Sequence, residues 1–101
     1  MKTPREQLAD LDYRIFMTGQ CFPSWIVPSA TGRHVALLSE QVVDCQRPLV
    51  VALVVRAATL TPLVDAGLLR LGEPEEVPEY EGRRGFWWEP GAVGRRLGRS
   101  P

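Results

Sequence analysis

The sequence predicts a small α+β domain, with helices and a short antiparallel sheet or hairpin. Three observations predict it: a capped apolar stripe of helical period near the N-terminus, short β-prone runs bounded by proline and glycine, and an aromatic run at residues 85–88 after a charged loop. A chain of 101 residues, 45% of them hydrophobic, has room for one core. We therefore expect a single domain over residues 1–90 and a flexible basic tail over 91–101.

The first expected element is a helix over residues 4–17. Thr3 is in position to cap it, Pro4 suits a first turn, and Glu6 stands where a capping box requires an acid. Gly19 can end the helix. The apolar stripe that should face the core consists of Leu8, Leu11, Ile15 and Phe16.

Residues 21–42 allow two interpretations. The run 25–27 is short and β-prone, and residues 28–32 are typical of a turn. Residues 34–38 then fit the returning strand of a hairpin, but they also fit the start of a helix that continues through Val42. The polar residues 39–41 favour the helix, and periodicity does not separate the two.

The apolar run 49–55 is the central ambiguity of the chain. Its four valines favour a buried strand, whereas Pro48 before it and the alanines at 57 and 58 favour a buried helix over 48–58. We favour the helix, because good helix formers follow the run directly. In either case we expect residues 49–55 to be fully buried.

A further helix start is expected at Thr61-Pro62, which repeats the Thr-Pro pair at residue 3. Its end has two interpretations. The helix can continue through Arg70 to a cap at Gly72, or it can stop at Gly67 and leave residues 68–71 to open a strand. With these segments we expect two or three helices after the first.

The last third of the chain separates into an acidic and a basic block. Residues 73–82 hold two prolines and five glutamates, which predicts a solvated loop or the tip of a wing. Residues 85–88, Gly-Phe-Trp-Trp, are the clearest strand in the sequence. Residues 91–101 are rich in glycine and arginine and are expected to fray.

Two stretches in this region share a family-like order. Leu63-Val64-Asp65-Ala66-Gly67-Leu68-Leu69-Arg70 is followed by a charged loop and by Arg83-Arg84-Gly85-Phe86-Trp87-Trp88. Over residues 60–90 this order resembles the recognition-helix end and wing of winged-helix DNA-binding regulators. The resemblance implies a winged-helix-like fold in which a glycine caps the recognition helix and paired bases approach the phosphate backbone or minor groove.

The sequence also departs from that family. Pro62 prevents an uninterrupted helix from running into Ala66, so a helix that ends at Gly67 is barely one turn long after the proline. A recognition helix must be long enough to lie in the major groove and present several side chains. A winged-helix-like fold and a helix that reads the DNA major groove are therefore two separate expectations, and the first can hold without the second.

The charge pattern bears on the partner. The formal net charge is zero, which argues against a strongly basic nucleic-acid binder. Yet residues 71–82 carry five glutamates and no base, and residues 83–101 carry five arginines against a single glutamate. If the arginines share one face away from the glutamates, a nucleic-acid partner is favoured. If the two blocks neutralise one another, a protein partner is favoured.

No catalytic or metal-binding constellation is indicated. His34 is the single histidine, and its spacing to Cys21 and Cys45 matches no metal pattern and no nucleophile arrangement with an orienting acid. We expect two reduced thiols, at least one of them buried, with no enzyme activity, no cofactor and no metal. The polar N-terminus and the short apolar runs predict a cytoplasmic protein with no membrane segment.

Two function classes follow from these observations. The first is a winged-helix-like regulator that contacts nucleic acid. The second is a phage- or mobile-element-encoded inhibitor or assembly component that binds a host protein through its acidic loop and an exposed aromatic residue. Of Trp87 and Trp88, one should face the core and one solvent. The candidate nucleic-acid-binding residues are Arg83, Arg84, Arg95 and Arg96, and the candidate partner-binding residues are Trp87, Trp88, Glu75, Glu76 and Glu79.

Overall fold

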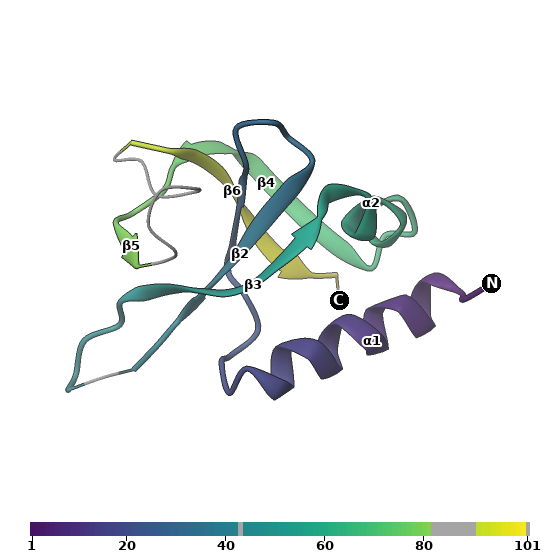
Figure 1. The fold of residues 1–101 in the computed structure, drawn as a ribbon, viewed down its shortest axis with the longest axis horizontal. Coiled ribbons are helices and arrows are strands. Elements are labelled where there is room, and N and C mark those ends of the chain that lie inside the picture. The colour runs from purple at the N-terminus through teal and green to yellow at the C-terminus, as the bar shows by residue number, and fades with distance from the viewer. Residues whose placement is uncertain (43, 82–90, 101) are drawn as a thin grey trace.

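The computed structural model describes residues 1–42, 44–81 and 91–100, and in these ranges the chain forms two helices and one six-stranded sheet (Figure 1). The α+β class is confirmed, but the sheet is larger than expected and one helix follows the first instead of two or three. Along the chain the elements are α1 (Pro4–Met17), β1 (Trp25–Pro28), β2 (His34–Glu40), β3 (Leu49–Arg56), α2 (Ala57–Asp65), β4 (Leu69–Glu76), β5 (Tyr80–Glu81) and β6 (Val93–Arg99).

Helix α1 has the bounds and the cap that the sequence predicts. The Glu6 amide donates to Thr3 Oγ1 at 3.2 Å, and the Thr3 amide donates to Glu6 Oε1 at 3.3 Å, which completes the capping box. Leu11 and Ile15 are buried against the sheet. Phe16 does not join that stripe: it is 75% exposed, so its assignment to the core was wrong.

The two open questions over residues 34–56 are both decided in favour of strands. β1 and β2 form an antiparallel hairpin, with Val27 opposite Ala36, and β2 pairs in turn with β3. The helix favoured for 48–58 is therefore wrong over 49–56, because β-branched valines paired with β2 outweigh the helix formers that follow them. Between the buried residues Leu49 and Val55, β3 is only half-buried, so full burial was also wrong.

Helix α2 starts earlier than expected and ends where one interpretation placed it. It begins at Ala57 rather than at Thr61. Pro62 lies inside it, so the expectation that this proline interrupts the helix before Ala66 was wrong. At its end the Leu68 amide donates to Leu63 O at 2.9 Å and Gly67 adopts φ of 74°. This left-handed glycine and its hydrogen bond form a Schellman stop, which releases the chain directly into β4.

The first part of the expected acidic loop and most of the expected basic tail are instead two paired strands. Residues 73–76 belong to β4, and Val93–Arg99 forms β6, which lies between β1 and β4. The antiparallel register sets Glu75 opposite Gly94, and the Ser100 amide donates to Leu68 O at 3.1 Å. Local composition predicted solvated, fraying chain, but pairing between these distant segments satisfies their backbone groups. The strand expected at 85–88 lies outside the described residues.

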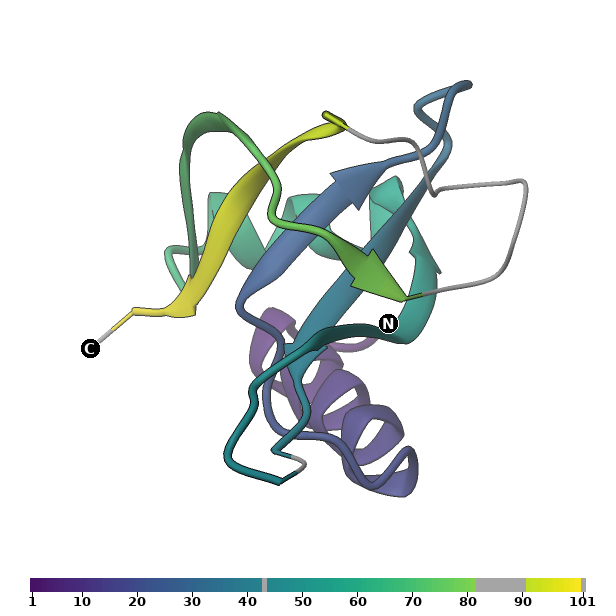
Figure 2. The ribbon, with the colours of Figure 1, turned by 90° about the vertical axis from the view of Figure 1, so that its left-hand side faces the viewer.

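The sheet curls back on itself. Its strand order is β4-β6-β1-β2-β3-β5, so the consecutive strands β4 and β5 stand at opposite edges. Five gaps of about 4.8 Å would separate these edges by roughly 24 Å in a flat sheet. The four Cα steps from Glu76 to Tyr80 reach at most about 15 Å. Residues 77–79, called the link below, therefore cross one side of the curled sheet, as Figure 2 shows.

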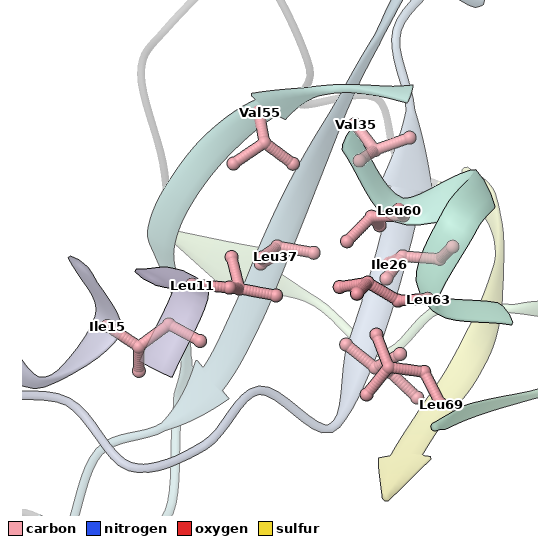
Figure 3. Close-up of a cluster of buried hydrophobic side chains, with 10 residues drawn as sticks. Leu11, Ile15, Ile26, Val35, Leu37, Val55, Leu60, Leu63 and Leu69 are labelled. Carbon is pink, nitrogen blue, oxygen red and sulfur yellow. The ribbon is translucent and has the colours of Figure 1, made fainter. Parts of the chain in front are cut away.

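This arrangement creates two cores on opposite faces of the sheet. The helix-side core lies between the sheet and the two helices, whose leucines and isoleucine point toward the strands in Figure 3. The link-side core lies between the sheet and the link. The helix-side core contains Leu11, Ile15, Ile26, Val35, Leu37, Val55, Leu60, Leu63, Leu69 and Leu97. The link-side core contains Trp25, Val27, Ala36, Leu38, Leu49, Val77 and Tyr80.

Gly94 in β6 lies close to the link and to β1. A Cβ at this position would lie 2.6 Å from Val77 Cγ2 and 3.2 Å from Val27 Cγ2, and it would also collide with the Ile26 carbonyl oxygen. Because that oxygen belongs to the backbone of β1, a side chain could not be accommodated by a rotamer change. Gly98, on the same strand, has no atom within 4 Å of the corresponding position.

Gly94→Ala should therefore destabilise the protein by about 1–3 kcal/mol, the usual range for overpacking. Gly98→Ala is the matched control, and it should be neutral or stabilising by up to about 1 kcal/mol because alanine lowers the entropy of the unfolded chain. Urea unfolding followed by circular dichroism gives both free energies of unfolding. Equal values for the two variants would contradict a close approach at Gly94.

Candidate binding surfaces

The structure places five of the nine predicted site residues. Arg83, Arg84, Trp87 and Trp88 lie outside the described residues. The remaining five are on or next to the paired strands β4 and β6: Arg95, Arg96, Glu75, Glu76 and Glu79.

Arg95 and Arg96 point to opposite faces of the sheet. Arg95 is opposite Ile26, which belongs to the helix-side core, and Arg96 is opposite Trp25, which belongs to the link-side core. The Arg96 guanidinium lies 4.1 Å from the centre of the Trp25 ring, in cation–π geometry. These neighbours in sequence therefore do not form one basic patch.

The third arginine of β6 is engaged with the N-terminal half of the chain. Arg99 lies 4.4 Å from the centre of the Phe22 ring and forms an ion pair with Asp12 of α1. Its role is to hold the end of β6 against the segment around α1, so it is not a free cation for a ligand.

The glutamates of β4 have a structural explanation. β4 is an edge strand, because β6 is its only neighbour in the sheet as described. Charged residues and proline on an edge strand prevent pairing with other chains. Glu73, Pro74, Glu75 and Glu76 supply both features, and all four are exposed. Glu79 is an exposed residue of the link.

The charge criterion can now be applied to the described residues. The acidic strand is paired directly with the basic strand, and Pro74 and Glu75 are opposite Arg95 and Gly94. The arginines of β6 do not share a face away from the glutamates. Neither half of the criterion is met in full, because Arg83 and Arg84 lie outside the described residues and no ion pair within the described residues joins a glutamate of β4 to an arginine of β6.

Helix α2, the position at which the winged-helix resemblance places a recognition helix, presents no base to solvent. Leu60 and Leu63 face the core. Its exposed residues are Ala58, Thr61 and Asp65, followed by Ala66 at the C-cap. The commonest readers of a major groove are bidentate arginine, lysine, asparagine and glutamine side chains, and this surface has none of them; it offers only short side chains such as Thr61 and Asp65.

An apolar surface that the sequence interpretation did not predict lies on the outer face of α1. Tyr13 and Met17 are each 64% exposed and Phe16 is 75% exposed. Their i, i+3, i+4 spacing puts them together on the side of the helix away from Leu11 and Ile15. We call these three residues the outer α1 patch. The sequence contains a signal for this patch. At 100° per residue, Phe16 is a full 100° from Ile15 around the helix and therefore lies outside the buried stripe.

An ion pair joins the N-terminal residues to the exposed surface of α1. Lys2 donates a hydrogen bond to Asp10, and this hydrogen bond, with the Coulombic attraction of the carboxylate, raises the pKa of Lys2. Both side chains are exposed.

A basic pocket of about 550 Å³ lies at the start of α2. Arg33, His34 and Arg56 line it together with Ala57 and Ala58. His34 and Arg56 are direct cross-strand partners, and the Ala57 amide donates to Arg33 O at 2.8 Å. Arg33 and Arg56 are 23 positions apart in sequence, so only the β2–β3 pairing brings them together.

The cysteines and the histidine do not converge on a metal site. Cys21 and Cys45 are free and both exposed, so the expectation of a buried thiol was wrong. Among the described residues, no group of three or more His, Cys, Asp and Glu side chains is arranged to hold a metal ion. No helix in the same ranges has the length and apolar character needed to cross a membrane.

Comparison of the chain with protein-family models, with curated proteins and with solved structures found no match. Its own surfaces therefore carry the functional argument.

Arg96 and Arg95 provide a matched pair for testing the contacts of β6. Arg96→Gln should lower the free energy of unfolding by about 0.5–1 kcal/mol, because the cation–π contact with Trp25 is lost. Arg95→Gln removes the same charge from the next position and should change it by less than about 0.5 kcal/mol. Thermal unfolding of both variants measures the difference. A larger effect at Arg95 would mean that the stacking on Trp25 contributes nothing.

Proposed function

We propose that this protein is a non-enzymatic protein-binding module and that the outer α1 patch is its contact surface. The observation that carries the proposal is the exposure of two aromatic side chains and a methionine on one helix face. Contiguous exposed apolar side chains mark interaction sites, and aromatic residues and methionine are enriched at protein interfaces.

The partner we propose is a folded protein that presents an apolar groove. Tyr13, Phe16 and Met17 have the spacing with which an amphipathic helix inserts one face into such a groove. Helix α1 is already formed and capped by Thr3 and Glu6, so binding would require little ordering of the chain. Such a module would act as an inhibitor or an assembly component.

The charge arrangement supports the same class. The acidic residues of β4 are paired beside the arginines of β6, and Arg99 is neutralised by Asp12. A protein partner needs no net basic surface, whereas a nucleic acid does. Two free thiols fit a reducing compartment, and we include a cytoplasmic location in the proposal on that ground.

The patch is tested by comparing two double variants of α1. Tyr13→Ser with Phe16→Ser removes the aromatic side chains, and Arg5→Ser with Arg14→Ser makes the same number of serine substitutions at exposed positions of the same helix. We expect the aromatic variant to lose at least about 2 kcal/mol of partner binding, roughly thirtyfold, while the arginine variant keeps most of its affinity. Both should remain folded by circular dichroism.

The partner is first identified with a photo-crosslinking amino acid at position 16 and, as a control, at the exposed position 61 of α2. Cross-links made at 16 and absent at 61 identify the bound protein by mass spectrometry, and calorimetry then gives the affinities. Identical cross-links from both positions, or equal affinities of the two double variants, would contradict the proposal. Cross-linking to a second copy of this chain would be seen as a dimer.

A nucleic-acid-contacting, winged-helix-like regulator is the second candidate. The observation that favours it is the exposure of Arg95 and Arg96. If it is correct, Arg95→Gln should weaken duplex binding at all sequences and flatten its salt dependence by about one phosphate contact, because Arg96 points to the other face of the sheet. Fluorescence anisotropy at several salt concentrations measures this. No binding at low salt would exclude the candidate.

A further inference from the structure

The basic pocket gathers two arginines and a histidine from two segments of the chain, residues 33–34 and residue 56. Arg33 ends the turn between β1 and β2, His34 begins β2, and Arg56 ends β3. Antiparallel partners such as His34 and Arg56 have Cα atoms about 4.5–5.5 Å apart, so their side chains share the same small region. Among the residues that the structure describes, no aspartate or glutamate lines the pocket.

The two arginines of the pocket are not neutralised by the protein. Within the residues that the structure describes, the ion pairs join Lys2 to Asp10, Arg47 to Glu40 and Arg99 to Asp12, and none involves Arg33 or Arg56. Both guanidinium groups line one pocket without an ion-pair partner among the described residues, and a bound anion would supply the opposite charge. The planar fork of a guanidinium matches phosphate oxygens in bidentate geometry.

The start of α2, beside the pocket, is also electropositive, because the backbone amides at a helix N-terminus carry partial positive charge. Arg56 is the N-cap residue of α2 and its side chain forms no capping hydrogen bond, and no acidic residue stands in the first turn. The Ala57 amide is bonded to Arg33 O, which ties the arginine to the helix start. The alanines at 57 and 58 are small, so their side chains do not fill the space between the cationic groups.

From the pocket, its two arginines and one histidine, and the absence of an acid among the described residues that line it, we infer that Arg33, His34 and Arg56 form a binding site for the phosphoryl group of a small phosphate monoester. A point-like anion fits better than a polyanion, since nucleic-acid binding needs a patch or stripe of bases that follows the backbone. The described arginines outside the pocket are dispersed: Arg95 and Arg96 occupy opposite faces, and Arg99 is ion-paired. The volume of about 550 Å³ is within the range of small-molecule sites.

The experiment titrates the protein with inorganic phosphate, with AMP, and with a single-stranded oligonucleotide that has a 5′-hydroxyl end. Two-dimensional NMR reports the site, and calorimetry reports affinity at constant ionic strength. We expect saturable binding of phosphate and AMP, with shifts concentrated on the amides of residues 33, 34 and 56–59. Arg33→Gln with Arg56→Gln should weaken AMP binding at least tenfold.

The matched control is Arg14→Gln with Arg70→Gln, which removes two exposed arginines outside the pocket and should leave AMP affinity within twofold. If the pocket double variant does not fold, each single variant should still weaken AMP binding at least threefold. No saturable binding at millimolar phosphate or AMP would overturn the inference. So would equal weakening by both double variants, or binding of the oligonucleotide alone, which would assign the pocket to a nucleic-acid backbone instead.

Discussion

The fold depends on one close approach, between the backbone of β6 at Gly94 and both β1 and the link. The link connects opposite edges of the sheet, so Val77 must cross the sheet at a distance that leaves no room for a side chain on β6. This approach closes the link-side core over Trp25 and Val27. Because the sheet curls around that core, its other face is left for the two helices, whose buried leucines complete the helix-side core.

The elements that could be predicted from the sequence are those specified by neighbouring residues. The capping box of Thr3 and Glu6 fixed the start of α1, and Gly67 with Leu63 and Leu68 specified the Schellman stop of α2. The wrong predictions concern segments whose secondary structure depends on pairing with a strand distant in sequence. Residues 49–56 became a strand because β2 pairs with them, and β4 and β6 became strands because each pairs with the other. Composition within a window contains no information about such partners.

The candidate surfaces follow the same division. The outer α1 patch is encoded locally, in the angular positions of Tyr13, Phe16 and Met17 around a helix whose bounds were predicted correctly. The basic pocket is not, since Arg33 and Arg56 meet only through the β2–β3 register. The acidic and basic blocks of the sequence do not predict the charged surfaces, for a related reason. Residues adjacent in a strand point to opposite faces, so a basic segment need not make a basic surface.

The position of β6 between β1 and β4 also determines when the strands of the sheet can pair during protein synthesis. When β4 leaves the ribosome, its only sheet neighbour in the described fold has not yet been made, and the edge of β1 that will accept β6 is also open. Until then the nascent chain exposes two unpaired strand edges, which are sites of aggregation in partly folded proteins. The glutamates and proline of β4 stand on one of these edges. Their charge therefore limits aggregation of the nascent chain before β6 is made, as well as aggregation of the folded protein.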